Sequence, residues 1–198
     1  MNHLIVVAHP RPGSFTASLA RAYGAALTSL GHGVGLRDLY AMGFDPVLTP
    51  EELAGTRAPA EDVAREQAEI AAADAVAFFY PLWWASMPAI LKGYIDRVLS
   101  YGFAYEVRSG GMHGLLQGKK GVIVTLSAAP AAILDRTGDW DAIRILQDAH
   151  IFRTCGIDIV VHEHYGEILP DLPDTVARAH LDRIRALART CFPSAKAS

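Results

Sequence analysis

Short apolar runs alternate with longer segments of helical periodicity along the chain. The first run, residues 4–8 (LIVVA), is rich in β-branched residues and has no polar position. Such a run is typical of a central parallel strand that is covered on both faces. Four further strands are predicted at residues 34–39, 75–80, 122–126 and 157–161.

Between the strands, apolar residues recur at the spacing of amphipathic helices. In the first predicted helix, Ser14 is a candidate N-cap and Gly31 a candidate C-cap. The apolar positions of this helix are Phe15, Leu19, Tyr23, Ala26 and Leu30. Further helices are predicted over residues 62–73, 141–152 and 175–189, and another begins at residues 86–88.

Strands that alternate with helices predict an α/β fold with a doubly wound, five-stranded parallel sheet, since parallel strands need a crossover. Ligands of such sheets bind beyond the carboxyl ends of the strands. Three loops lie there and are candidates for the site: residues 8–18, 80–86 and 126–139. Residues 108–118 are predicted to be an ordinary surface loop.

Composition adds a small apolar excess to this picture. Of the 198 residues, 51% are hydrophobic and 20% are charged, against roughly 45–50% and 25% in soluble domains. The excess indicates a large core, an apolar pocket or a subunit interface. A formal net charge of −3 leaves no basic footprint for nucleic acid or an anionic membrane surface.

Cys155 and Cys191 lack the spacing of a disulfide framework or a zinc site, so a reducing compartment is expected. The apolar start at residues 4–8 is too short for a signal peptide. Residues 75–91 fall short of the roughly 20 apolar residues that a membrane span needs. We therefore expect a cytoplasmic protein without membrane insertion.

The first candidate loop reads HPRPGSFTAS and has neither GxGxxG nor a P-loop motif. Instead it offers the hydroxyls of Ser14, Thr16 and Ser18 at a helix N-terminus, where backbone N–H groups favour a phosphate. His9 would add a further donor. The alternative, that Ser14 only caps the helix, is equally consistent with the pattern.

The second candidate loop is rich in aromatic residues. Trp83 and Trp84 follow a buried strand and offer flat apolar faces suited to an aromatic ring system. The alternative is that both are core or interface residues. Together with Met87 they are expected to form an exposed apolar patch on a single chain.

Four stretches of the chain carry a resemblance. They are AHPRPGSFTASLA (8–20), DLYAMGFDPVLTPEEL (38–53), DVAREQAEIAAADAVAFFYPLWWASMPAILKGYIDRVLSYGFAYE (62–106) and, more weakly, LLQGKKGVIVTLSAAP (115–130). In this order they resemble the flavodoxin-fold NAD(P)H:quinone oxidoreductases, a DT-diaphorase-like family that is related to flavoprotein ancillary subunits of potassium efflux systems. The pattern PLxWxxxPAxLKGxxDRV is the most specific part of the match.

The resemblance implies a single flavodoxin-like, flavin-binding domain over residues 1–198, with strand order 2-1-3-4-5. It implies FAD, with FMN as the alternative, and NAD(P)H as co-substrate. The residues implied at the flavin phosphates are His9, Ser14, Phe15, Thr16 and Ser18. Those implied along the isoalloxazine edge are Pro81, Leu82, Trp83 and Trp84. Ser127, Ala128 and Ala129 would close over the pyrimidine side of the ring.

The chain departs from the family pattern after the fourth predicted strand. Where the family has TTGG or similar, this chain reads LSAAP, so methyl groups narrow the approach and Pro130 removes a donor. The Tyr and His that often follow in the family are also missing. We hypothesise that Arg136 stabilises the charge of the reduced flavin, or else is a solvated loop residue.

The reaction implied is a ping-pong hydride transfer from NAD(P)H through the flavin to a quinone or similar aromatic acceptor. The flavin carries the chemistry, so no nucleophilic side chain is needed. The family also implies a homodimer with shared active sites. Trp84, Ala85 and Tyr105 would line the acceptor pocket, with Tyr105 from the partner chain and Ala85 widening the pocket.

His162 and His164 lie just after the last predicted strand, where alternation places both on one face. A metal pair is conceivable there, but no third ligand is evident, so we predict no metal site. Two alternative functions stay open beside quinone reduction. One is a flavin-binding regulatory subunit of a membrane transporter, and the other is a specialised biosynthetic quinone, azo or nitro reductase.

Overall fold

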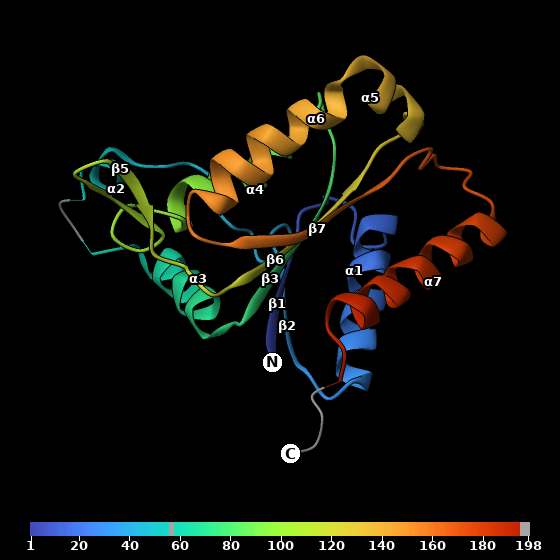
Figure 1. The fold of residues 1–198 in the computed structure, drawn as a ribbon, viewed down its shortest axis with the longest axis horizontal. Coiled ribbons are helices and arrows are strands. Elements are labelled where there is room, and N and C mark those ends of the chain that lie inside the picture. Colours follow the sequence, from blue (N-terminus) through green and yellow to red (C-terminus); the bar gives the residue numbers. More distant parts are fainter. Residues whose placement is uncertain (56–57, 195–198) are drawn as a thin grey trace.

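The computed structural model describes residues 1–55 and 58–194, and its central feature is a five-stranded parallel sheet (Figure 1). Its strands are β1 (Asn2–Val7), β2 (Gly33–Asp38), β3 (Ala75–Pro81), β6 (Lys120–Leu126) and β7 (Asp158–Tyr165). They lie in the order β2-β1-β3-β6-β7. In order of the parallel strands along the chain this is 2-1-3-4-5, so the predicted fold is confirmed.

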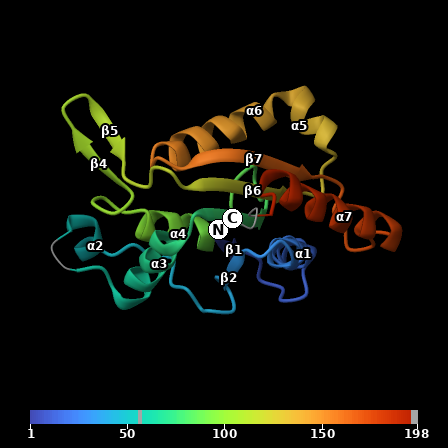
Figure 2. The ribbon, with the colours of Figure 1, turned by 60° about the horizontal axis from the view of Figure 1, so that its bottom comes forward.

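Helices cover both faces of the sheet, as Figure 2 shows. The helices α1 (Phe15–Ser29) and α7 (Asp174–Cys191) cover one face, and α3 (Glu61–Ala72), α4 (Ala89–Val98) and the π-helix η1 (Ile145–Arg153) cover the other. Successive strand residues therefore enter different cores. In β1, Leu4 and Val6 pack on the α3–α4 side, whereas Ile5 and Val7 pack on the α1–α7 side. Every residue of β3 is buried.

The segment at residues 108–118 corrects a prediction, because it is not an ordinary surface loop. Strands β4 (Tyr105–Arg108) and β5 (Gly111–Gly114) form an antiparallel hairpin that projects from the fold (Figure 2). Gly110 and Gly111 adopt φ values of +111° and +126° at the turn, which glycine tolerates best. Strands of four residues carry too little alternation to be recognised in the sequence.

The helical region before β7 begins earlier than predicted. Within the predicted loop 126–139 lies α5 (Ala131–Thr137), and Gly138 at φ +79° separates it from α6 (Asp139–Arg144). In Figure 1, α6 continues into η1 as one coil, and α5 lies at an angle to its start. The π-helix turns two adjacent residues, Gln147 and Asp148, into the interior.

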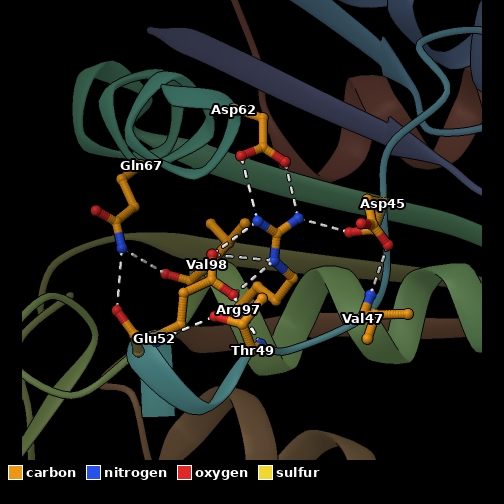
Figure 3. Close-up of polar contacts among 9 residues, drawn as sticks. Asp45, Val47, Thr49, Glu52, Asp62, Gln67, Arg97 and Val98 are labelled. Carbon is orange, nitrogen blue, oxygen red and sulfur yellow. Dashed lines mark hydrogen bonds and ion pairs between the residues drawn. The ribbon is translucent and has the colours of Figure 1, made fainter. Parts of the chain in front are cut away.

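A buried arginine fastens the segment after β2 to the body of the fold (Figure 3). On α4, Arg97 donates to the carboxylates of Glu52 and Asp62 and, at 2.6 Å, to the backbone oxygen of Asp45. Glu52 belongs to the short helix α2 (Pro50–Ala54), which the sequence patterns did not predict and which begins with a capping box at Thr49. Within the described residues, no helix combines the length and apolarity of a membrane span.

Replacing Arg97 by Met should lower the free energy of unfolding by roughly 2–4 kcal/mol, because it removes the shared partner of two carboxylates and a buried backbone oxygen. The control is Arg65→Met, since Arg65 forms a solvent-exposed pair with Glu61 on α3. Losing that pair should cost about 0.5 kcal/mol or less. Urea unfolding measures both variants, and equal losses would contradict the structural role assigned to Arg97.

Candidate functional site

A cleft of about 480 Å³ lies at the carboxyl ends of β1, β3 and β6. This is the edge at which doubly wound sheets bind ligands. The residues that line it are His9, Arg11, Gly13, Ser14, Phe15, Thr16, Ser18, Pro81, Leu82, Trp83, Leu126, Ser127, Ala128, Ile168, Leu169, Pro170, Leu172 and Ala177. The three loops singled out in the sequence therefore meet at one cleft.

The N-terminus of α1 forms the polar wall of the cleft. Ser14 caps the helix by accepting a hydrogen bond from the backbone N–H of Ala17 at 3.2 Å, so its capping role is real. Ser18 Oγ donates to the backbone oxygen of Ser14 at 3.1 Å. The N–H groups of Phe15 and Thr16 belong to the first turn, where a helix supplies no acceptor. They can donate to an anion in the cleft.

His9 adds a second donor to this wall. Its Nδ1 accepts a hydrogen bond from the backbone N–H of Arg11 at 3.0 Å. Burial, followed by the charge of Arg11, lowers the pKa of His9, so the ring is neutral at physiological pH. A neutral ring that accepts at Nδ1 carries its hydrogen on Nε2.

The aromatic wall is held by a strained turn. Trp83 and Ser86 exchange two backbone hydrogen bonds of 2.9 and 3.0 Å. Between them, Trp84 and Ala85 both adopt positive φ, at +54° and +55°, as in a two-residue type I′ turn. Such values cost about 1–2 kcal/mol for a non-glycine residue. Backbone strain of this kind is concentrated at functional sites.

This turn separates the two tryptophans. The indole ring of Trp83 lines the cleft, with its centroid 6.2 Å from that of the His9 ring. The side chain of Trp84 is fully exposed, whereas Met87 is only 7% exposed. The expected exposed apolar patch thus includes Trp83 and Trp84 but not Met87, because Met87 packs with α4 in the core.

The loop after β6 forms the third wall and is fastened to the end of β7. The backbone N–H of Ser127 donates to the backbone oxygen of Tyr165 at 3.0 Å. In return, the N–H of Glu167 donates to the backbone oxygen of Ala129 at 3.2 Å, and the N–H of Ile168 donates to that of Ser127 at 2.9 Å. Ser127 and Ala128 line the cleft. Ala129 is not one of its lining residues.

Several other predicted residues also lie outside the cleft. Trp84, Ala85 and Tyr105 do not line it within one chain, and Arg136 is exposed on α5. Conversely, sequence reasoning missed the residues Arg11, Ile168, Leu169, Pro170, Leu172 and Ala177. The rule that ligands bind at strand ends could have found the last five, because they follow β7 at the same edge.

His162 and His164 are part of β7 and do not follow it, since the strand continues to Tyr165. His162 Nδ1 lies 2.8 Å from Asp148 Oδ1, and His164 Nδ1 lies 2.9 Å from Thr125 Oγ1. Burial, with the neighbouring His162, lowers the pKa of His164 to about 4. Among the residues with described positions, no three or more His, Cys, Asp or Glu side chains are arranged to hold a metal.

The family model of the flavodoxin-like fold matches residues 1–188. An uncharacterized NAD(P)H oxidoreductase of Haemophilus influenzae is 39% identical over 175 residues, which cover 85% of each chain. The human ribosyldihydronicotinamide dehydrogenase (quinone) is 37% identical over 154 residues, or 68% of this chain and 67% of that protein. The chain belongs to the NAD(P)H:quinone oxidoreductase family of the flavodoxin-like fold.

Solved structures agree with this assignment. The NAD(P)H:quinone oxidoreductase from Methanothermobacter marburgensis superposes with a TM-score of 0.87 at 31% identity, covering 97% of this chain and 99% of that one. An FMN-dependent NADH-azoreductase from Bacillus anthracis, solved with FMN, has a TM-score of 0.71 and 18% identity, and it covers 96% of this chain and 98% of its own. At that identity it supports the fold alone.

Replacing Ala85 by Gly should stabilise the protein by about 1 kcal/mol, because glycine adopts positive φ without steric cost. The melting temperature should rise by roughly 2–4 °C. As a control, Ala179→Gly on the exposed face of α7 should lower it by a similar amount, since glycine weakens a helix. A fall on Ala85→Gly would contradict the strained turn.

Proposed function

We propose that this protein is a flavin-dependent NAD(P)H oxidoreductase that reduces quinones or similar aromatic acceptors by two electrons. The composition of the cleft supports this proposal. At the ligand-binding edge of the sheet, a single cleft joins the free N–H groups of a helix N-terminus to an aromatic wall at Trp83. A flavin nucleotide requires this combination, since its phosphate is anionic and its ring is flat and apolar.

The flavin, when bound, supplies the hydride-accepting chemistry. The chain then has to bind and orient it. Phe15 and Thr16 would donate backbone N–H groups to phosphate oxygens, and the Nε2–H of His9 and the charge of Arg11 lie on the same wall. Pro81, Leu82 and Trp83 would hold one side of the ring and exclude water. Ser127 and Ala128 would face the pyrimidine side of the ring.

We favour FAD over FMN. FMN ends at the phosphate, but the cleft is also lined by a group of apolar side chains that follow β7, which we call its apolar section. This section consists of Ile168, Leu169, Pro170, Leu172 and Ala177. Such a lining suits the adenine ring of FAD, and Arg11 suits the second phosphate.

We also propose that two copies of the chain form a homodimer with shared sites, one domain over residues 1–198 in each copy. Tyr105 begins the hairpin that projects from the fold (Figure 2), and it does not line the cleft of its own chain. The hairpin exposes Val107 and Met112, and η1 exposes Ile145 and Leu146. A second copy that covers these side chains would bring Tyr105 to the partner's site, beside Trp84 and Ala85.

A cytoplasmic location is proposed on the basis of the cysteines. Cys155 is buried and Cys191 half-buried, and both are free thiols, which a reducing compartment maintains.

The purified protein should bind one FAD per chain and reduce a simple benzoquinone with NADH or NADPH. Because the nicotinamide leaves before the acceptor binds, double-reciprocal plots at several acceptor concentrations should be parallel.

The variant Arg11→Ala removes a positive charge from the polar wall of the cleft. In steady-state kinetics, the FAD concentration that gives half-maximal activity should rise at least fivefold. A protein that bound neither flavin would refute the proposal. Flavin binding without turnover, together with capture of a transporter, would favour the regulatory alternative.

The choice of FAD can be tested at Ala177, which lines the apolar section beside α7. Replacement by Phe should fill that section and raise the Kd of FAD at least tenfold, while the Kd of FMN changes less than twofold. Fluorescence titration of the flavin-free protein measures both constants. Equal weakening of the two flavins would show that the adenine ring does not occupy this section.

A further inference from the structure

A chain of hydrogen-bonded side chains leads away from the cleft, and the proposed function gives a role only to its last member, Ser127. Its members are Asp148, His162, Thr125, His164 and Ser127. The successive distances are 2.8 Å from Asp148 to His162, 3.4 Å from His162 to Thr125, 2.9 Å from Thr125 to His164 and 3.1 Å from His164 to Ser127. It begins at a carboxylate on η1 and ends at a side chain that lines the cleft.

Asp148, Thr125 and the side chain of His162 are shielded from water, whereas His164 and Ser127 are partly buried. Asp148 is 3% exposed. Thr125 is fully buried near the carboxyl end of β6, which lies between β3 and β7 in the sheet. The Trp140 ring packs against both imidazoles, with centroids 4.7 Å from His162 and 5.4 Å from His164. Burial of polar groups lowers the stability of a fold unless each group is hydrogen-bonded. Apolar side chains of similar size would give the fold equal or greater stability. The cost points to a role beyond packing.

The directions of the hydrogen bonds can be assigned around His164. A neutral imidazole has one donor and one acceptor nitrogen. The Ser127 hydroxyl donates its hydrogen to the backbone oxygen of Ala129, 3.0 Å away. Ser127 Oγ therefore accepts from Nε2–H of His164, which leaves Nδ1 to accept from the Thr125 hydroxyl. His164 thus fixes the rotamer of Ser127, and Ser127 fixes the turn at Ala129.

We infer that His164 is a positioning residue for the flavin: through Ser127 it holds the loop 127–129 at the pyrimidine edge of the ring. This inference rests on the proposed function. The loop has alanines where the family has glycines, so its approach to the ring has little tolerance. The N–H groups of this loop stabilise negative charge on the reduced ring, and an ill-fixed loop stabilises it less.

Two substitutions separate positioning from packing. The amide of Asn reaches the place of Nδ1, so His164→Asn keeps the bond to Thr125 and loses the bond to Ser127. The amide of Gln reaches the place of Nε2, so His164→Gln keeps the bond to Ser127. Each variant loses one hydrogen bond, so similar losses of thermal stability are expected in the flavin-free protein.

The readout is the two-electron midpoint potential of bound FAD, measured by dye-linked reduction together with the Kd of oxidised FAD. For His164→Asn and for Ser127→Ala, the affinity for reduced FAD should fall about tenfold more than that for oxidised FAD. A tenfold change lowers the potential by about 30 mV. For His164→Gln, the ratio of the affinity for reduced FAD to the affinity for oxidised FAD should stay within twofold of the wild-type ratio.

Equal shifts in His164→Asn and His164→Gln, or no shift in either, would overturn the positioning role while leaving the proposed function intact. Failure of the wild-type protein to bind any flavin would overturn both.

Discussion

The structure depends on one constraint: its central strands are buried on both faces. Every residue of β3 is enclosed, and β1 sends alternate side chains into two separate cores. A parallel sheet enclosed in this way can be entered only at its edges and strand ends. Because β1, β3 and β6 are parallel, all three end at the same edge of the sheet, and the loops that follow them meet there. The cleft follows from the packing of the sheet.

The loops at this edge have little freedom. The α1 N-terminus is capped by Ser14, the Trp83–Ser86 turn is closed by two backbone bonds, and the Ser127 loop is tied to β7. Positive φ at Trp84 and Ala85 is retained because the surrounding contacts determine it. Prearranged donors and apolar walls need no reordering when a ligand binds, which lowers the cost of binding. The small apolar excess of the chain is divided between the two cores, the cleft wall and side chains that remain exposed.

Much of the fold could be predicted from residue patterns. Runs such as residues 4–8 are short and rich in β-branched residues, which favours buried strands, and their alternation with helices predicts a parallel sheet. The hairpin at Tyr105–Gly114 and the helix α5 were missed, because short elements depend on tertiary contacts that local patterns do not contain. The continuation of β7 through His162 and His164 was missed for a related reason. Their polar side chains are stabilised by Asp148 and Thr125, which are distant in sequence.

The site was predicted in part. The α1 and tryptophan loops are continuous in sequence, so their residues could be identified, whereas the apolar section from Ile168 to Ala177 has no motif. Flavin binding in this cleft can be tested by a crystal structure of the protein grown with FAD. The isoalloxazine ring should lie against Trp83, and the phosphates should lie at the backbone N–H groups of Phe15 and Thr16. A flavin bound elsewhere, or a ring turned away from Trp83, would contradict this prediction.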